Sequence, residues 1–327
     1  MKVILPLAGK GTRLLPLTKA TPKPLVRVAG RPVMDYVMDK VSALDVEELI
    51  IITGHLKEHV EEYVTTHYDC PSRFVEQKVQ DGTAGAVNLA RPFVDSPVLI
   101  IFVDTLFDAD LTAINRVEAD GIIWAKEVED YERYGVVVTD AHGNMIRIVE
   151  KPSEPISKLA NIGLYYIRDW PTLYDGIDYT LSQPKHKGEW FLTDAFQYMI
   201  DHGKTIRTAE VGGWYDCGKV ETLLETNRHL LETSRSRVPE TGRGLEIIEP
   251  VRVGVGAMVE NATIGPNVTI DDGAIVRNSR IRDSIIGCGS TIEGSTLEHS
   301  LVGENAEVKD MTYHNMVITR DEVAVAP

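Results

Sequence analysis

The residues best suited to chemistry in this chain form a basic, glycine-containing segment near its start. The apolar run of residues 3–8 ends at Gly9 and Gly11, and Arg13 and Lys23 follow within the same segment. Glycines let the backbone approach a ligand closely, so that successive N–H groups can face a phosphate. The spacing fits neither a Walker loop nor a dinucleotide fingerprint. The segment predicts an anion site of another kind, although an ordinary strand-to-helix turn would also explain the glycines.

The elements that must position this segment alternate between strands and helices. Residues 49–53 and 98–103 are near-continuous apolar runs, and helical patterns begin after Pro32 and end near Tyr68. This order is typical of a mostly parallel sheet with helices on both faces. Such sheets bind ligands beyond the carboxyl ends of their strands, which is where Gly9 lies.

Several motifs, taken in order, resemble those of the sugar nucleotidyltransferases, which make nucleoside diphosphate sugars. Leu7 to Thr18 and Pro22 to Leu25 match the family's triphosphate-binding pattern, and Glu150-Lys151-Pro152, residues 161–166 and residues 214–218 match later motifs. The resemblance covers residues 1–234. It implies a Rossmann-like α/β fold and an enzyme that joins a sugar 1-phosphate to a nucleoside triphosphate with release of pyrophosphate.

The resemblance also implies roles for individual residues. Arg13 and Lys23 would hold the triphosphate, Lys151 the attacking sugar phosphate, and Asp104 and Asp216 a Mg²⁺ ion, which prefers oxygen ligands. Asp104 taken alone could equally begin a turn. The expected catalytic residues are Arg13, Lys23, Lys151 and Asp104, and the expected substrate contacts are Leu7, Ala8, Gly9, Gly11, Thr12, Gln77, Gly82, Thr83, Gly135, Glu150, Asn161, Gly163 and Glu189.

The choice of base rests on two of these residues. Gln77 and Gly82 keep the spacing of family members that read a pyrimidine, and a side-chain amide suits the imide edge of thymine or uracil. We therefore expect dTTP or UTP, with glucose 1-phosphate as the sugar substrate. The adjoining Gly82-Thr-Ala-Gly85 resembles relatives that use GTP. A mannose-1-phosphate guanylyltransferase remains the alternative.

A different period begins after a polar linker at residues 235–250. Aliphatic residues recur every five or six positions from Val253 to Val302, with Gly, Asn, Asp and Ser between them. This is the hexapeptide signature of a short left-handed parallel β-helix, whereas a β-sandwich would alternate with period two. About ten repeats predict about three coils. The expected domains are a catalytic domain at 1–234 and a β-helix domain at 251–327.

The β-helix leaves two further functions open. His299 or His314 could act as the base of an acyltransferase, which would make the enzyme bifunctional. A non-catalytic regulatory subunit is the other alternative, but the arginine, lysines and aspartates of the motifs are all present. Because a short β-helix exposes its terminal coil, we expect it to pack against the catalytic domain or another subunit and to build a homo-oligomer.

Composition and charge argue against several other functional classes of protein. The formal net charge is −15 at pH 7, so the chain lacks the basic footprint of a nucleic-acid binder. Cys70, Cys217 and Cys288 are scattered and indicate neither a disulfide framework nor a cysteine zinc site. No apolar run approaches the length of a membrane span. These features predict a cytoplasmic enzyme without nucleic-acid or membrane partners.

Overall fold

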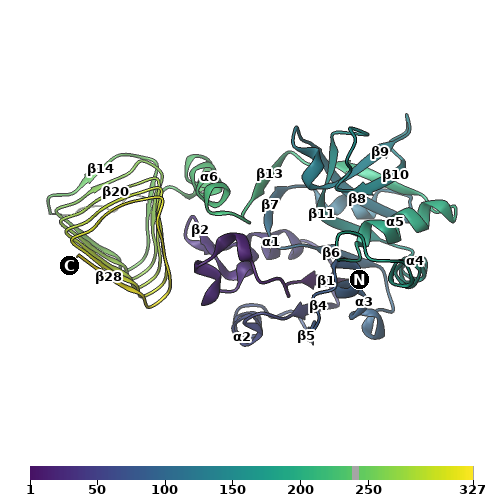
Figure 1. The fold of residues 1–327 in the computed structure, drawn as a ribbon, viewed down its shortest axis with the longest axis horizontal. Coiled ribbons are helices and arrows are strands. Elements are labelled where there is room, and N and C mark those ends of the chain that lie inside the picture. The colour runs from purple at the N-terminus through teal and green to yellow at the C-terminus, as the bar shows by residue number, and fades with distance from the viewer. Residues whose placement is uncertain (238–242, 327) are drawn as a thin grey trace. The chain divides into compact units, whose positions relative to one another are not determined.

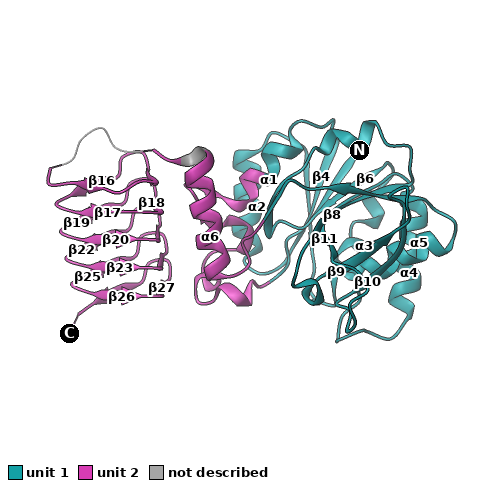
Figure 2. Cartoon of the chain, turned by 90° about the horizontal axis from the view of Figure 1, so that it is seen from above, with its two compact units in different colours: residues 1–9, 37–214 teal, residues 10–36, 215–327 magenta. Residues whose placement is uncertain are grey.

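The computed structural model describes residues 1–237 and 243–326 (Figure 1). Residues 238–242, which belong to the expected linker, lie outside the described residues. The chain divides into two compact units, and each is assembled from separate stretches of sequence (Figure 2). The first unit comprises Met1–Gly9 and Val37–Trp214, and the second comprises Lys10–Tyr36 and Tyr215–Pro327.

The first unit is built on a nine-stranded mixed sheet. Its main path runs β10-β9-β11-β6-β1-β4-β5, with β8 beside β11 and β12 beside β8. The pairs β1–β4, β1–β6, β4–β5 and β8–β12 are parallel, and β11 is antiparallel to its neighbours. The strands are β1 (Lys2–Pro6), β4 (Glu48–Thr53), β5 (Ser72–Glu76), β6 (Val98–Ile101), β8 (Gly121–Glu127), β9 (Gly135–Thr139), β10 (Met145–Glu150), β11 (Leu159–Ile167) and β12 (Ile206–Glu210). The predicted Rossmann-like sheet is confirmed.

Helices cover this sheet because their apolar faces pack on its buried central strands, such as β6. The helices are α1 (Val33–Val41), which crosses the division between the units, α2 (Lys57–His67), α3 (Thr83–Asn88), α4 (Trp170–Ser182) and α5 (Leu192–Asp201). Ile4, Ile50 and Ile100 on the central strands are fully buried in the core that α4 and α5 help to close. None of the helices in the described part of the chain is both long and apolar enough to cross a membrane.

The second unit contains the rest of the glycine-containing segment. Residues 12–25 form three short 3-10 turns, and a small hairpin of β2 (Arg27–Val28) and β3 (Arg31–Pro32) follows. Helix α6 (Val220–Leu230) starts shortly after Asp216 and continues as a π-turn, Leu231–Arg235. Two short strands lie beside the expected metal-binding aspartates: β7 (Thr105–Asp108) begins after Asp104, and β13 (Gly213–Asp216) ends at Asp216.

The C-terminal part of the second unit is a parallel β-helix with three sheets, each with five strands among the described residues. The coils stack as a triangular prism (Figure 1). The sheets are β14 (Glu246–Ile247), β17 (Thr263–Ile264), β20 (Arg280–Arg282), β23 (Thr296–Glu298) and β26 (Thr312–His314); β15 (Val251–Val253), β18 (Val268–Ile270), β21 (Ile285–Ile286), β24 (Leu301–Val302) and β27 (Val317–Ile318); and β16 (Met258–Glu260), β19 (Ile275–Arg277), β22 (Thr291–Glu293), β25 (Glu307–Lys309) and β28 (Val323–Val325).

The expectation of about three coils was wrong, since the sheets contain five. Paired residues such as Thr296 and Thr312 show a coil of 16 residues, shorter than three hexapeptides. The shorter coil arises at the corners, where single residues such as Asp283 and His299 turn the chain with φ values of 44° and 49°. Asn and Asp adopt this left-handed region more readily than most residues. The first and last coils also carry apolar positions that the count of repeats did not include.

Within the second unit, the β-helix is bonded to residues of the expected catalytic domain. Asn227 of α6 is fully buried, and its Oδ1 accepts hydrogen bonds from Ala29 N–H at 3.0 Å and from Thr269 Oγ1–H at 2.7 Å. Arg27 Nε donates to Asp271 Oδ2 at 2.8 Å. These contacts connect the segment of residues 10–36, helix α6 and the β-helix into one structure.

Candidate active site

Residues 7–9 lie at the carboxyl end of β1, held by contacts with the next strand. Leu7 N–H donates to Ile52 O at 2.8 Å, which extends the pairing of β1 with β4. Gly54 packs so closely that a Cβ there would lie 2.8 Å from Ala8 O. A Cβ at Gly9, by contrast, would have no heavy atom within 4 Å. The protein thus fixes this backbone on one side and leaves open space at Gly9.

The next part of the segment folds on itself inside the second unit. Gly11 has φ 62°, and a Cβ there would lie 2.9 Å from Thr18 Cγ2 and 3.2 Å from Lys23 Cβ. Thr18 is buried, and its hydroxyl donates to Gly11 O at 2.9 Å. Thr12, which begins the first 3-10 turn, is exposed. Thr18 therefore fixes the predicted loop, although the sequence reasoning did not include it among the site residues.

Arg13 and Asp216 are brought together around Gly218. Asp216 Oδ1 accepts a hydrogen bond from Gly218 N–H at 2.7 Å, and Oδ2 accepts one from Thr222 Oγ1–H at 3.2 Å. A Cβ at Gly218 would lie 2.8 Å from Asp216 Oδ1 and 3.0 Å from Arg13 Nη2. The guanidinium and the carboxylate thus both lie next to Gly218. It was part of the quoted motif but not of the predicted site.

The expected base-reading residues meet the segment that carries Glu189. Gln77 is buried, and its Nε2 donates to Asp81 Oδ1 at 3.1 Å and to Gly82 O at 3.4 Å, which leaves Oε1 as an acceptor. Gly82 has φ 119°, and a Cβ there would lie 2.3 Å from Trp190 O. The residue that follows Glu189 is therefore packed directly on the turn that follows Gln77.

Backbone pairing fixes that arrangement. Trp190 N–H donates to Asp81 O at 2.9 Å, and Ala84 N–H donates back to Trp190 O at 3.0 Å. Thr83 Oγ1 accepts a hydrogen bond from Leu192 N–H at 2.8 Å at the start of α5. Asp81 and Trp190 were missed by sequence reasoning, because their contacts join segments about a hundred residues apart.

The expected sugar-binding residues of β9, β10 and β11 form one buried cluster. Asn161 Nδ2 donates to Gly135 O at 2.8 Å, while Asn161 Oδ1 accepts from Tyr165 Oη–H and, at 3.4 Å, from Gly163 N–H. A Cβ at Gly135 would lie 2.2 Å from Asn161 Nδ2 and 2.8 Å from Glu150 Oε2. The structure therefore brings Gly135, Glu150, Asn161 and Gly163 together, as expected from the motifs.

Glu150 and Lys151 present opposite charges at the edge of this cluster. Glu150 Oε2 accepts from Thr193 Oγ1–H at 3.3 Å, and Lys151 Nζ lies 3.9 Å from Oε1. Burial raises the pKa of Glu150, against the opposing effects of Lys151 and Thr193. Lys151 has φ 46°, and its ammonium lies 4.8 Å from the centroid of the Phe191 ring. The lysine thus remains near the carboxylate without a direct hydrogen bond to it.

Asp104 lies on the same side of the first unit as this cluster. It follows β6 in a turn, and Phe102, two residues earlier, donates its N–H to Gly163 O at 2.9 Å. Burial, followed by the nearby carboxylates of Glu150 and Asp104, raises the pKa of Tyr165. The phenol therefore senses both carboxylates, which places the expected metal ligand Asp104 near the expected sugar-binding residues.

Comparisons with known proteins agree with these motifs. The model of the family described as "Nucleotidyl transferase" matches residues 2–233. The chain belongs to this nucleotidyl transferase family. Among its relatives, "Bifunctional protein GlmU" of Methanococcus aeolicus is 33% identical over 94% of this chain and 79% of that protein. "Glucose-1-phosphate thymidylyltransferase" of Streptomyces griseus is 27% identical over 94% of this chain and 93% of that protein.

A solved structure resembles this nucleotidyltransferase over its first part. UDP-glucose pyrophosphorylase complexed with UDP-glucose superposes with a TM-score of 0.64 and 26% identity, covering 71% of this chain and 98% of that chain. Nucleotidyltransferases of the family generally use a divalent metal. The donor set here fits a hard cation, because both candidate ligands are carboxylates. Each Asp216 oxygen accepts one of the hydrogen bonds described above and keeps a lone pair for a cation.

Proposed function

We propose that this nucleotidyltransferase joins glucose 1-phosphate to dTTP or UTP and releases pyrophosphate. The observation that carries the sugar assignment is the buried cluster of Gly135, Glu150 and Asn161 beside Lys151. It offers a carboxylate acceptor for hydroxyl groups next to a cation for a phosphate. The thymidylyltransferase relative, which spans the β-helix as well, acts on the same sugar phosphate by its name.

The chain's residues act in this reaction by positioning two anions and balancing their charge. A phosphate oxygen of the sugar phosphate attacks the α-phosphorus in line, and the bond to the leaving pyrophosphate breaks. Such a transfer needs little covalent help from protein. Arg13 and Lys23 hold the triphosphate and stabilise the leaving pyrophosphate, while Lys151 holds the attacking phosphate. Mg²⁺ held by Asp104 and Asp216 would neutralise charge on the α-phosphate.

The base assignment rests on Gln77. Its amide nitrogen is used within the protein, so the remaining Oε1 acceptor suits the imide N–H that thymine and uracil share. Guanine also carries a ring N–H, which keeps the guanylyltransferase as the second candidate. Pyrophosphate release should be measured for five triphosphates against glucose, mannose and N-acetylglucosamine 1-phosphates. Highest kcat/KM with GTP and mannose 1-phosphate would overturn the assignment.

The same assay tests the proposed metal ligands. Asp104→Asn is expected to lower kcat at least about a hundredfold, because a lost charge at a metal site weakens stabilisation of the transferring phosphoryl group. Near-normal turnover of the Asp104 variant with Mg²⁺ would refute its role.

Lys151→Ala is expected to raise the KM for the sugar phosphate while leaving triphosphate affinity unchanged. Loss of triphosphate affinity in the Lys151 variant would show that the two anion sites are reversed.

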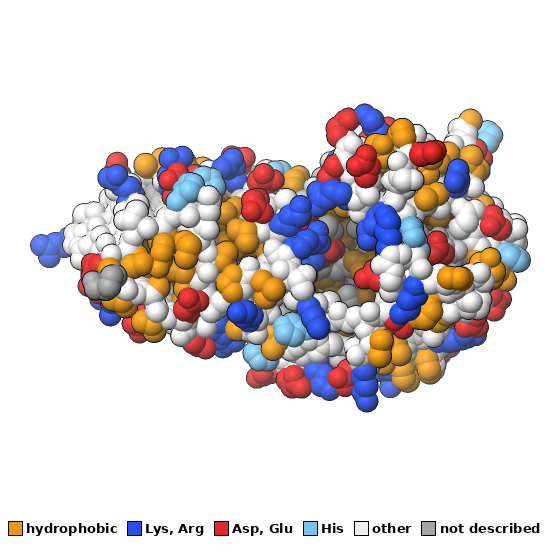
Figure 3. Space-filling view, in the orientation of Figure 1, with side chains coloured by type: hydrophobic (Ala, Val, Ile, Leu, Met, Phe, Trp, Pro, Cys, Tyr) orange, Lys and Arg blue, Asp and Glu red, His pale blue; other side chains and the backbone are white. Residues whose placement is uncertain are grey.

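We further propose a homo-oligomer in the cytoplasm. The last strand of the β-helix leaves Val323 and Val325 exposed by 63% and 51%, and hydrophobic side chains gather over the β-helix in the space-filling view (Figure 3). A second copy could cover such a surface. Cys70, Cys217 and Cys288 are free thiols, which fits a reducing compartment. Light scattering of the full chain tests the oligomer, and a monomer mass would contradict it.

A further inference from the structure

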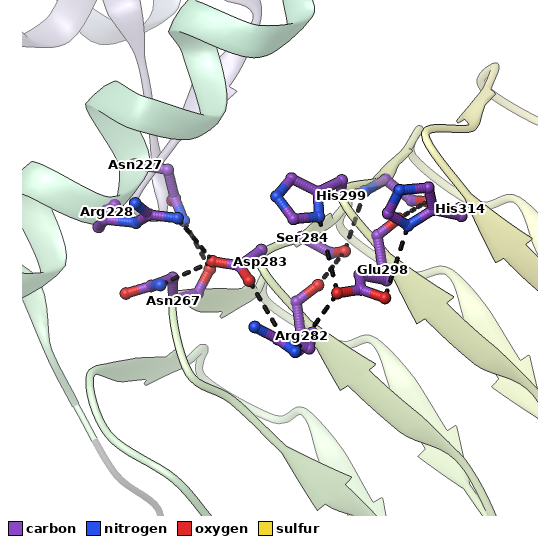
Figure 4. A network of polar contacts seen from close by, with 10 residues as sticks. Asn227, Arg228, Asn267, Arg282, Asp283, Ser284, Glu298, His299 and His314 are labelled. Carbon is purple, nitrogen blue, oxygen red and sulfur yellow. Dashed lines mark hydrogen bonds and ion pairs between the residues drawn. The ribbon is translucent and has the colours of Figure 1, made fainter.

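Two histidines and a glutamate meet at one corner of the β-helix, away from the motifs of the proposed reaction. Glu298 ends β23 and His314 ends β26, and the two residues are partners in the parallel register of neighbouring coils. His299 follows Glu298 at the corner with φ 49°. Figure 4 shows the two imidazoles flanking the Glu298 carboxylate. The fold itself thus stacks these three side chains.

Their distances suit a shared cation better than direct hydrogen bonds. Glu298 Oε1 lies 3.9 Å from His299 Nδ1, and Glu298 Oε2 lies 3.5 Å from His314 Nδ1. One ligand atom from each of the three residues lies within 4.8 Å of the others. Zinc bonds of about 2.1 Å in a tetrahedron place two ligand atoms about 3.4 Å apart, so the side chains would have to close together by up to about 1.4 Å to complete the geometry.

One atom of the group lacks a hydrogen-bond partner among the described residues. His299 Nδ1 is closed off from solvent and makes no hydrogen bond in the described structure. A buried polar atom without a partner is costly, and such atoms are uncommon in folded proteins. The 3.9 Å to Glu298 is too long for a hydrogen bond. A cation between the imidazoles and the carboxylate would give this nitrogen a ligand bond.

The surroundings already hold the carboxylate in place. Arg282 Nη1 lies 3.4 Å from Glu298 Oε1, and Arg282 Nε lies 3.2 Å from Asp283 Oδ2. Asp283 also accepts from Arg228 Nη2 at 2.9 Å and from Asn267 Nδ2 at 2.7 Å (Figure 4). Arg282 therefore has a second carboxylate partner when Glu298 turns to a cation. Groups around metal ligands commonly orient them in this way.

We propose that Glu298, His299 and His314 bind one Zn²⁺ or a similar borderline transition-metal ion, with water in the remaining position. Two imidazoles and one carboxylate are a common zinc ligand set, and imidazole also favours Co²⁺, Ni²⁺ and Cu²⁺. Mg²⁺ prefers oxygen ligands, so this site is chemically distinct from Asp104 and Asp216. The ion would connect β23 to β26 of the next coil.

The test is a zinc titration of the full chain after removal of metals, in excess Mg²⁺ to occupy oxygen sites. Competition with a chromogenic chelator should show one Zn²⁺ per chain. His314→Ala and Glu298→Gln are each expected to weaken that binding at least tenfold. His142→Gln, a histidine on an exposed loop of the first unit, is the matched control and should bind zinc like the wild type. Equal zinc affinity in the wild type, His314→Ala and Glu298→Gln would overturn the proposal.

Co²⁺ spectroscopy identifies the ligands. Co²⁺ bound to two imidazoles and a carboxylate should give a visible absorption band in the wild type that His314→Ala loses. A strong near-ultraviolet band would instead place the ion on a cysteine thiolate and overturn the proposal. Zn²⁺ should raise the melting temperature of the wild type but not that of His314→Ala, since only the former gains a ligand in the folded state. An unfolded variant is recognised by circular dichroism, and Glu298→Gln then decides.

Discussion

At the scale of single residues, the site depends on groups that are packed too closely to tolerate an added methyl. Gly218 is one such case, because a Cβ there would meet both Asp216 Oδ1 and Arg13 Nη2. Its backbone is not in the left-handed region, so an alanine there is opposed by these two side chains and not by φ. A substitution there tests whether the position of the guanidinium matters to the reaction.

Gly218→Ala is therefore expected to lower kcat at least about tenfold without unfolding the protein. The new Cβ would start 3.0 Å from Arg13 Nη2, so the guanidinium must move from its place beside Asp216. One misplaced charge-bearing group commonly costs two orders of magnitude or more in phosphoryl stabilisation. Steady-state kinetics in the Arg13→Ala background give the control. If Gly218→Ala lowers kcat equally there, its effect does not pass through Arg13.

Glu150 presents the opposite case, a charge held at a cost in stability. Its pKa is raised above its ordinary value of 4.5, chiefly by burial. Between 4.5 and the raised value, the folded state binds more protons than the unfolded state, so stability falls as pH increases through that range. At neutral pH the ionised carboxylate thus destabilises the fold.

Glu150→Gln should accordingly raise the melting temperature at pH 7.5. The gain should vanish below pH 4.5, where the wild-type carboxyl is protonated in both states. The same variant should raise the KM for the sugar phosphate. Glu154→Gln, an exposed neighbour, is the control and should change neither property. A lower melting temperature at pH 7.5 for Glu150→Gln would contradict this interpretation.

At the scale of elements, local patterns were enough to predict most strands but not their partners. The apolar runs gave β4 and β6 because continuous burial leaves a continuous signal. The motifs singled out Arg13, Glu150 and Lys151 as candidate site residues because each is part of a short contiguous pattern. Gln80, whose Nε2 donates to Ala8 O at 2.7 Å, could not be found in that way. Its role depends on a contact across 72 positions of sequence.

The β-helix shows a second reason for failure. Its period was visible, but the number of coils was not, because the counted repeats end at Val302 while β25 to β28 continue the three sheets beyond it. The contact between Arg27 and Asp271 was also invisible, since neither residue is part of a motif. Yet Asp271 is 1% exposed and is a charged partner of the hairpin that follows the basic segment. Asp271, which follows β18 of the β-helix, therefore supports the hairpin that carries Arg27.

Asp271→Ala is expected to destabilise the protein by about 3 to 5 kcal/mol, because it leaves a largely buried guanidinium without its partner. Burial raises the pKa of Asp271, and the nearby Arg27 opposes that rise. Removing either charge therefore leaves the other charge buried without the attraction that compensates for its lost hydration. Urea unfolding measures the loss. Glu307→Gln, which removes an exposed charge near Lys309, is the control and should change stability by under about 1 kcal/mol. Equal stability of both variants would contradict a supporting role for Asp271.

At the scale of the whole molecule, the second unit combines part of the expected catalytic domain with the β-helix. Asn227 and Arg27 bond to Thr269 and Asp271, so the β-helix is part of the structure that fixes residues 10–36. The expectation from sequence, that the repeat packs against the catalytic domain or another subunit and builds an oligomer, did not identify the residues that make this connection. Truncation before the β-helix therefore removes Asp271, the partner of Arg27, and Thr269, a partner of Asn227.

Truncation after Ser236 is expected to lower both the melting temperature and, at least about tenfold, the turnover, because Arg27 and Asn227 lose their partners. Turnover should be measured at low temperature, with circular dichroism to select folded material. Light scattering on the same samples reports the change in assembly. Wild-type turnover in a folded, truncated chain would show that the loop needs no support from the β-helix.

The second unit is built from two distant stretches of sequence, which has a consequence for biosynthesis. Arg27 and Asp271 are 244 positions apart, and at about 5 to 20 residues per second the ribosome needs about 12 to 50 s to make the intervening chain. The basic segment emerges among the first residues, but its Arg27 meets Asp271 only after most of the chain has been made. A nascent chain released before Asp271 would carry the basic segment without this partner, so we expect it to share the lowered turnover that is predicted for the truncated chain.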